Sequence, residues 1–407
     1  MDLDRLKAKL RKFFTFFVAP PKTWRRPNIA DILVYDDCNS EVLVPCLTGY
    51  RIEILHLRGE TINVPCLWRA AFTAEFWRGN PIQSYVDAFI RLVQPRLVLT
   101  YIDNDPGFYS ISKRFATIKT LFVQNGTRGE VGDVFGYLQP SDSYHVDYML
   151  VHGRAIGAHY SKFISGNAIA IGSFKNNAVP SSSAAADKTV LFFSQFSCRP
   201  SGDAPFLFEP DGRPVRWDDF HRADVAVVSF LDSWCARNTW QLIICGRDFK
   251  KEGPEWEFFA SHLRGCRWKY IPRSDVFGSY RLIDAAELVV FIDSTLGYES
   301  LARGKRTAAF SCRGWPSNEH AFRFGWPSEM PDSGPFWTNR MDEAEFCRIL
   351  DYLLVASEHE WERDRQLFST DLMAYDPGNS LFRSITSDLL GHSAPPKRGD
   401  DLAGLLT

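Results

Sequence analysis

The sequence lacks an apolar run approaching the ~20 residues that a helix needs to cross a bilayer. It also lacks a large charge of one sign, because its net charge is −2, and this argues against a nucleic-acid partner. The nine cysteines are scattered and include no CxxC pair. We therefore predict reduced thiols in a cytosolic protein, no zinc site, and enough chain for two ordinary globular domains.

Several catalytic signatures are missing as well. No GxSxG, HExxH or GxGxxG appears, which argues against a hydrolase, a zincin and a dinucleotide-binding protein. The loop at residues 124–129 has two glycines and an arginine but no GK[ST], so it is not a P-loop. His145, His152 and His159 are seven residues apart, which is not a metal-site spacing, and no metal cofactor is expected.

The first 26 residues are rich in positively charged side chains and contain a short aromatic run. They hold eight Lys or Arg residues against Asp2 and Asp4, with FFTFFVA at positions 13–19. A signal peptide fits poorly, because no small-x-small cleavage site follows. A basic aromatic helix on the inner face of the cytoplasmic membrane fits better, since cations meet anionic lipid and Phe enters the interface. A helix packed on its own domain is the open alternative.

The rest of the chain alternates strand and helix signals in two blocks. Apolar runs that end in polar residues occur between residues 31 and 177 and again between 189 and 310. This pattern predicts an α/β protein with two Rossmann-like domains, whose parallel sheets face a central cleft. We place the domains at residues 27–180 and 189–390, joined by a Ser/Ala-rich linker at 178–188, with a flexible tail at 391–407.

The segment from Asp293 to Lys305 is the strongest candidate site. An apolar strand leads to Ser294 and Thr295 at the start of a helix, where free N–H groups and partial positive charge receive a phosphate. Gly297 allows the close approach of a ligand, and Glu299, one turn on, is placed to accept hydrogen bonds from ribose hydroxyls. Arg303 at i+4 is expected to pair with Glu299, and Gly304 to end the helix. A capped helix with no ligand is the plain alternative.

Two other strand ends of the second block offer further donor contacts. Gly246 and Arg247 follow one strand, and a fixed arginine suits a diphosphate or carboxylate because its fork binds in a bidentate way. Ser194 and Gln195 follow the first strand of the block and add donors. An interdomain salt bridge of Arg247 is the alternative interpretation.

Carboxylates follow the strands of the first block. Asp36 and Glu41 lie just after the first strand, and Asp103 follows another. A sugar hydroxyl loses a proton as it attacks, so a general base is expected among these three. Capping of the next helix by Asn39 or Ser40 explains the first cluster equally well.

Several of these segments resemble a family of bacterial surface-carbohydrate biosynthesis proteins. The stretches are DILVYDDCNSE, TYIDND, LFVQNGTRG, VDYMLVHG, IGSFKNN, ICGRD and VFIDSTLGYESLARGKRTAAF, within residues 31–314. The resemblance implies a GT-B-like fold with the donor nucleotide held mainly by the C-terminal domain and no obligatory metal. Relatives of this family include transferases for capsule, O-antigen and lipopolysaccharide, some of which use CMP-activated Kdo.

The resemblance also implies roles for matching positions. Ser294, Thr295 and Glu299 would hold donor phosphate and ribose, and Arg247 would neutralise the charge of the leaving group. Asp36 or Glu41 would face the acceptor. The implied function is transfer of a sugar from a nucleotide sugar to a growing glycan or lipid-linked acceptor. A polyol-phosphate transferase, a nucleotide-sugar epimerase or a non-catalytic partner of a polysaccharide assembly complex are the alternatives that the same fold leaves open.

Overall fold

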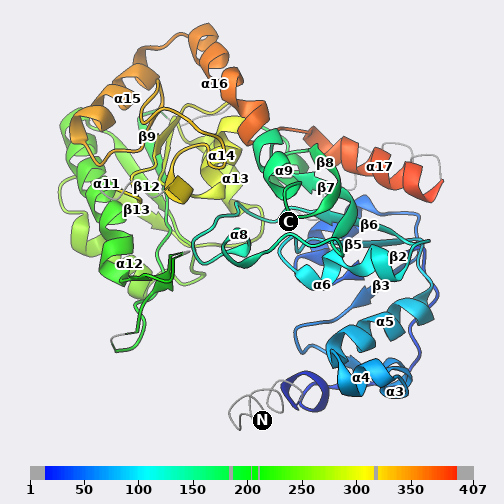
Figure 1. Cartoon of the computed structure of the whole chain (residues 1–407). Helices are drawn as coiled ribbons and strands as arrows, with labels where there is room; N and C mark the ends of the chain where they lie inside the picture. The colour runs from blue at the N-terminus through cyan, green and yellow to red at the C-terminus, as the bar shows by residue number, and fades with distance from the viewer. Residues whose placement is uncertain (1–13, 183–186, 203, 210, 316–319, 392–407) are drawn as a thin grey trace.

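Two parallel sheets of six strands form the framework of the protein (Figure 1). The structure is a computed structural model, which describes residues 14–182, 187–202, 204–209, 211–315 and 320–391. Half of the segment proposed for the membrane surface, residues 1–13, and nearly all of the predicted tail, residues 392–407, therefore lie outside the described residues. The domain boundaries stay predictions, and we call the parts built around the two sheets the first and second unit.

The first sheet has the strand order β3-β2-β5-β6-β7-β8. Its apolar strands are covered on both faces, as parallel sheets require, so residues such as Leu33 and Leu99 are fully buried. The strands are β2 (Ile32–Tyr35), β3 (Ile52–Leu55), β5 (Leu97–Thr100), β6 (Lys119–Val123), β7 (His145–Val151) and β8 (Ser165–Ala170). The helices of this unit are α2 (Ser40–Leu43), α3 (Val64–Ala71), α4 (Ala74–Arg78), α5 (Pro81–Val93), α6 (Pro106–Tyr109), α7 (Ile111–Arg114), α8 (Val134–Tyr137), α9 (Arg154–Tyr160) and α10 (Phe174–Ala178).

The second sheet has the order β13-β12-β9-β14-β15-β16, which is the doubly wound order with its switch point between β9 and β14. The strands are β9 (Thr189–Phe193), β12 (Gln241–Cys245), β13 (Arg267–Ile271), β14 (Leu288–Phe291), β15 (Thr307–Phe310) and β16 (Trp337–Thr338). The helices after β9 are α11 (Trp217–Asn238), α12 (Pro254–His262), α13 (Gly278–Ala285), α14 (Thr295–Ala302), α15 (Glu343–Val355), α16 (Glu358–Leu372) and α17 (Ser380–Leu390).

Small elements complete both units. Strand β1 (Lys22–Thr23) pairs in parallel with β4 (Ile62–Asn63), and β10 (Leu207–Phe208) pairs with β11 (Pro214–Val215) in a hairpin. A π-helical turn, η1 (Phe14–Val18), precedes β1 and packs on the first unit, since Phe17 is 2% exposed. The short helical turns η2 (Val44–Cys46), η3 (His320–Phe322) and η4 (Pro377–Asn379) lie in connections.

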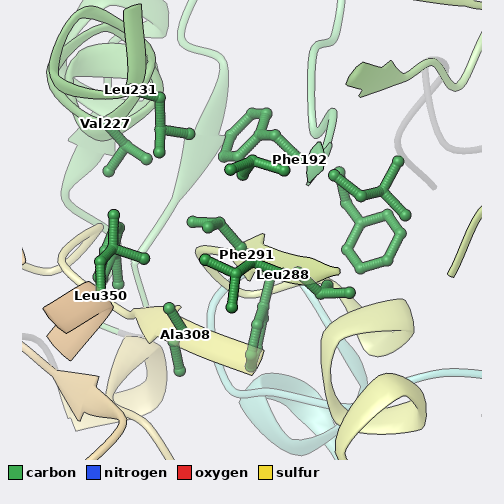
Figure 2. Close-up of a cluster of buried hydrophobic side chains, with 14 of the residues drawn as sticks. Phe192, Val227, Leu231, Leu288, Phe291, Ala308 and Leu350 are labelled. Atoms are coloured by element: carbon green, nitrogen blue, oxygen red, sulfur yellow. The ribbon is translucent and has the colours of Figure 1, made fainter. Parts of the chain in front are cut away.

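A single apolar cluster holds the second unit together. Figure 2 shows Val227 and Leu231, one turn apart on α11, with Phe192 of β9, Phe291 of β14 and Leu350 of α15 among the side chains of this cluster. Each is fully buried, which stabilises the fold by about 1.5–3 kcal/mol for each large side chain. This packed cluster therefore holds the strands of the sheet, and with them the residues at their ends, in fixed positions.

Helix α17 returns to the first unit. It follows the second sheet in the chain, yet Phe382 and Leu390 pack with Ile32 and Leu97 of the first sheet. The rings of Phe382 and Phe174 are 4.9 Å apart, in an edge-to-face arrangement. Figure 1 shows α17 extending from the second unit along the first. The sequence placed residues 380–390 in the C-terminal domain, but these contacts bind them to the first sheet.

None of the helices in the described part of the chain combines the length and apolar character that a bilayer crossing requires.

Candidate functional site

The carboxyl ends of the two sheets meet in a pocket between the units. The loop after β6 contributes Thr127 and Arg128, and the turn into α14 contributes Asp293 and Tyr298. The pocket has a volume of about 180 Å³, and Arg323 and Trp326 close its far side. Since drug-sized ligands occupy about 300–1,000 Å³, this pocket holds a phosphate or a sugar but not a whole nucleotide sugar. It lies at the ends of parallel strands, where open α/β sheets bind ligands.

The loop after β6 is held in place by a buried ion pair. Asp103 is fully buried, and its carboxylate accepts hydrogen bonds from Arg128 Nε (2.7 Å), the Asn125 N–H (3.1 Å) and the Tyr160 hydroxyl (2.5 Å). Burial by itself raises the pKa of Asp103, but Arg128 and these hydrogen bonds together hold that pKa below its usual range. These contacts leave the carboxylate no free face. The catalytic role predicted for Asp103 is therefore not supported, and we assign it the positioning of Arg128.

Asp293 is held by a second buried network. Arg313 donates from Nη2 to Asp293 at 3.1 Å and from Nη1 to Asp224 on α11 at 2.7 Å. Asp224 in turn lies 3.0 Å from His221 Nδ1. Both carboxylates face a guanidinium with a side chain 1% exposed, so the cation is fully neutralised. The network fixes Asp293 at the mouth of the pocket, and two carboxylates on one guanidinium leave no spare positive charge there.

Helix α14 begins beside the pocket, as the sequence predicted. Ser294 is its N-terminal cap residue but makes no side-chain hydrogen bond to the helix. The Thr295 hydroxyl joins the two units, because Oγ1 accepts a hydrogen bond from the Thr127 N–H at 3.0 Å. Gly304 follows the helix with a φ of +84°, the left-handed geometry expected for a terminating glycine.

Gly297 has a packing role. A Cβ at this position would lie 2.0 Å from the ring of Phe291, which no side chain tolerates. The absence of a Cβ lets α14 lie on β14, so packing alone explains glycine here, and the approach of a ligand to Gly297 stays a prediction. Gly246 is similar, because its Cβ would lie 2.3 Å from the Tyr270 hydroxyl.

Glu299 is buried between the units instead of lying open to a ligand. It is 4% exposed, and the hydroxyls of Ser173 and Tyr280 bond to its carboxylate. Burial raises the pKa of Glu299, and these bonds and the charge of Lys175 only partly oppose that rise. Burial lowers the pKa of Lys175, and the negative charges of Glu299 and Glu41 oppose that lowering.

Arg303 does not pair with Glu299, contrary to the i+4 expectation. Its guanidinium binds Asp284 of α13 in a bidentate way, with Nε–Oδ1 at 3.0 Å and Nη2–Oδ2 at 2.7 Å. The same side chain donates to the carbonyl oxygens of Asn176, Val179 and Pro180 at 3.0–3.3 Å. Arg303 thus joins the helix of the candidate site to the connection between the two units.

Arg247 lies at the end of β12, away from the inter-unit pocket. Its Nη1 donates to the carbonyl oxygens of Gln195 and Phe196 at 3.4 and 3.3 Å. The Ser194 hydroxyl accepts the Phe196 N–H at 3.2 Å. Ser194, Gln195, Gly246 and Arg247 therefore lie together at the ends of β9 and β12, and these contacts of Arg247 stay within the second unit.

A larger pocket of about 580 Å³ lies in the first unit at the ends of β2 and β5. Asp36 and Asp105 line it together with apolar side chains that include Phe16 and Ile82. Asp36 has a φ of 74°, a left-handed backbone that costs most non-glycine residues about 1–2 kcal/mol. Its carboxylate accepts hydrogen bonds from the Cys38 N–H (2.9 Å) and Arg58 Nε (2.8 Å).

Glu41 is exposed on the first turn of α2 and does not line either of these pockets. Of the two carboxylates predicted to face the acceptor, Asp36 lines the 580 Å³ pocket, and Glu41 lines neither of these two pockets. The capping alternative does not hold for Asn39, whose side chain makes no cap bond and instead accepts a hydrogen bond from Lys175 Nζ at 2.9 Å.

Sequence reasoning missed three polar side chains of the inter-unit region. Arg323 lies in a connection without a periodic pattern, and Lys175 lies on α10 after β8, where the sequence pattern predicted no site residue. His152 was tested only as a metal ligand, although it follows β7 directly and obeys the strand-end rule that identified Asp36. His152 is 2% exposed, and its Nε2 has no hydrogen-bond partner in the described part of the chain. It lines a small cavity next to Arg128 and Trp326.

The buried His152 predicts a loss of stability in mild acid. Burial, with Arg128 opposing the charged form and Asp103 favouring it, lowers the pKa of His152 from 6.5 to about 4. The unfolded chain then takes up this proton first, so the stabilisation is complete above pH 6.5 and is lost as the pH falls toward 4. The loss amounts to about 3 kcal/mol at 1.36 kcal/mol per pKa unit.

Urea unfolding of the wild type and of His152→Gln between pH 7.5 and 4 measures this loss in the free energy of unfolding. The wild type should lose about 3 kcal/mol more than the variant over that range. His145→Gln is the matched control, because His145 is partly exposed and should leave the wild-type pH dependence unchanged. Parallel curves for the wild type and His152→Gln would contradict the assignment.

Within the described ranges, no group of three or more His, Cys, Asp or Glu residues is arranged to hold a metal ion.

Comparison with known proteins gives one family and one fold. A family described as "putative O-antigen biosynthesis protein" matches residues 121–389. A search of curated protein sequences finds no match.

Solved structures share the fold of this chain at low sequence identity. One is described as a "putative UDP-N-acetylglucosamine 2-epimerase" from Listeria monocytogenes, with 11% identity, a TM-score of 0.54, and coverage of 90% of this chain and 98% of that chain. Another is the MnaA–UDP co-structure from S. aureus, with 10% identity, a TM-score of 0.50 and the same two coverages. The predicted GT-B-like fold, with two parallel sheets, is confirmed.

Proposed function

Because this chain belongs to the family of O-antigen biosynthesis proteins, we propose that it is a metal-independent glycosyltransferase of surface-glycan assembly. Its reaction would move a sugar from a nucleotide-activated donor, such as CMP-Kdo or another nucleotide sugar, to a growing glycan. The observation that carries this proposal is the pocket where the two carboxyl edges meet, with α14 starting beside Arg128 and Arg323. Helix N–H groups and arginines together favour the phosphate of a sugar nucleotide.

The donor lies, in this proposal, along the strand ends of the second unit. Its phosphates bind the start of α14 at Ser294 and Thr295, and its ribose reaches Glu299 when the contacts of that carboxylate with the first unit open. The nucleotide extends over the residues that follow β9 and β12, which are Ser194, Gln195, Gly246 and Arg247. Arg128 and Arg323, which are held by Asp103 and Asp332, would have to turn part of their N–H groups to the leaving phosphate to stabilise the negative charge that develops on it.

The acceptor occupies the 580 Å³ pocket of the first unit. Its hydroxyl oxygen forms a bond to the anomeric carbon as the bond from that carbon to the phosphate oxygen breaks. The hydroxyl proton passes to the Asp36 carboxylate, and the nucleotide leaves with the bonding electron pair. The position of Asp36 after β2 and its left-handed backbone support this role.

A panel of nucleotide sugars tests the function. Calorimetry with CMP, UDP and GDP is expected to show binding of at least one, and transfer from the matching sugar nucleotide to a lipid-linked glycan should release that nucleotide. The variant Ser294→Pro should leave the first turn of α14 intact, but its ring would obstruct the approach of a phosphate to the N–H groups at the start of the helix. Nucleotide binding should therefore weaken about tenfold or more. A protein that binds none of the three nucleotides would contradict the proposal.

A nucleotide-sugar epimerase is the second candidate, because the solved structures described as epimerases share this fold over most of both chains. An epimerase converts its substrate without any acceptor, whereas a transferase needs one. Incubation with UDP-N-acetylglucosamine alone, followed by NMR of the sugar, separates the two. Formation of a second epimer of the sugar would show that the protein is an epimerase and would overturn the proposed transfer.

A further inference from the structure

The first unit carries a group of exposed aromatic side chains that the proposed reaction does not use. Trp68 of α3 and Phe72, the residue after α3, are 62% and 82% exposed, Trp77 of α4 is 71% exposed, and Trp24, just after β1, is 75% exposed. We call these four side chains the aromatic face. Single exposed apolar residues are ordinary on soluble proteins, but exposed aromatics concentrated on two short consecutive helices and the strand beside them mark an interaction site.

Neighbouring groups hold the rings of the aromatic face in fixed positions. Helix α3 buries Cys66 and Ala70 and turns Trp68 and Phe72 outward, one turn apart, with stacked rings 6.0 Å apart. The Trp77 indole N–H donates to the Ala71 carbonyl oxygen at 2.8 Å. Because this N–H already has a protein partner, the Trp77 ring enters a water-poor environment without losing a hydrogen bond.

Positive charge accompanies the aromatic rings. The segments 22–26 and 64–78 carry five exposed cations and one carboxylate, Glu75, although the whole chain has a net charge of −2. Strand β1 brings the first segment to α3, because Asn63 Nδ2 donates to the Arg25 carbonyl oxygen at 2.9 Å. The five cations are Lys22, Arg25, Arg26, Arg69 and Arg78.

The aromatic face also lies beside the 580 Å³ pocket. Phe16 and Ile82 line that pocket, and the neighbouring Phe17 packs on Phe76 of α4 with ring centroids 5.7 Å apart. Figure 1 shows α3 and α4 at the end of the first unit that points away from the second. A planar surface can therefore reach this end without closing the cleft between the units.

We propose that the aromatic face docks on an anionic lipid bilayer. Tryptophan and phenylalanine enter the interfacial layer, and the surrounding arginines and lysine meet the negative headgroups. This proposal uses only described residues, from Lys22 onward, and does not depend on sugar transfer. It places the pocket of the first unit close to membrane-held material.

Co-sedimentation of the full chain with lipid vesicles tests the proposal. The wild type should bind vesicles of phosphatidylglycerol and phosphatidylcholine, and bind vesicles of phosphatidylcholine alone more weakly. The double variant Trp68→Ser/Phe72→Ser should bind the mixed vesicles at least about tenfold more weakly, while its melting temperature stays close to that of the wild type because both side chains are exposed. Added salt should weaken wild-type binding.

The matched control is Phe208→Ser, which removes an aromatic side chain that is 54% exposed on the β10–β11 hairpin and should bind as the wild type does. Absence of wild-type binding, or equal binding by the double variant, would overturn the proposal. A dimer that the double variant loses in sedimentation velocity, with no vesicle binding by either protein, would overturn it in favour of self-association. All variants keep residues 1–26 unchanged. A contribution of that segment to vesicle binding therefore cannot account for a difference between the proteins.

Discussion

Replacing Arg303 by methionine is expected to lower the free energy of unfolding by about 3–5 kcal/mol, the range for breaking a buried ion pair from one side. The Arg303 side chain is 0% exposed, and its partner Asp284 is 8% exposed. Methionine fills much of the space but leaves the carboxylate without its cation. It also removes the donors that serve the carbonyl oxygens of Val179 and Pro180 in the connection between the units.

Arg281→Met is the matched control for this prediction. Arg281 also pairs with an aspartate, Asp275, but the two side chains are 52% and 44% exposed. Such a surface pair contributes about 0–1 kcal/mol, so the control should unfold at nearly the wild-type urea concentration. Chemical denaturation of the three proteins at pH 7.5 makes the comparison. Equal midpoints for Arg303→Met and the wild type would show that the inter-unit connection does not depend on this side chain.

The partner of Arg303 illustrates what local spacing leaves undetermined. The i+4 rule pointed to Glu299, and such a pair contributes only about 0.2–0.5 kcal/mol on an exposed helix. At a buried position the guanidinium needs partners for all its N–H groups, and Asp284 with three backbone carbonyls supplies them. The decisive contacts come from α13 and the connection, which no spacing within α14 reveals.

The strands were predictable for the opposite reason. Runs such as residues 97–100 and 189–193 are apolar on both faces, and only a covered parallel sheet buries such runs. The return of α17 to the first sheet was not predictable, because its apolar side chains fit the face of either sheet. Only the position of Phe174 and the first-sheet strands selects the site where Phe382 packs.

The candidate site was predictable to the extent that it follows strand ends. That rule identified Asp36 and the start of α14, and it also selected Asp103, which burial turns into a support for Arg128. The rule locates a residue after a strand but does not give the direction of its side chain. No sequence pattern pointed to Arg323, since it reaches the pocket from a connection without regular structure.

Changing Asp36 to asparagine is expected to reduce kcat for sugar transfer by about 10²–10⁴-fold, the range that general-base catalysis contributes. Asparagine keeps the size of the side chain and an oxygen that accepts the Cys38 N–H, but it cannot take the proton of the acceptor hydroxyl. KM for the donor should change little, because the donor binds the second unit. Arg58 loses its partner without a large cost to folding, since its side chain is 50% exposed.

Glu41→Gln distinguishes this role from a general effect of charge near the cleft. Both substitutions remove one negative charge from the segment after β2, but Glu41 does not line the 580 Å³ pocket. Steady-state assays of nucleotide release with a saturating acceptor should therefore give nearly wild-type kcat for Glu41→Gln. If instead Glu41→Gln lost transfer and Asp36→Asn kept it, the acceptor would lie toward Lys175, and the base would act from the opposite end of the cleft. The left-handed backbone of Asp36 favours the first outcome, because a fold retains such a conformation where the direction of the side chain matters.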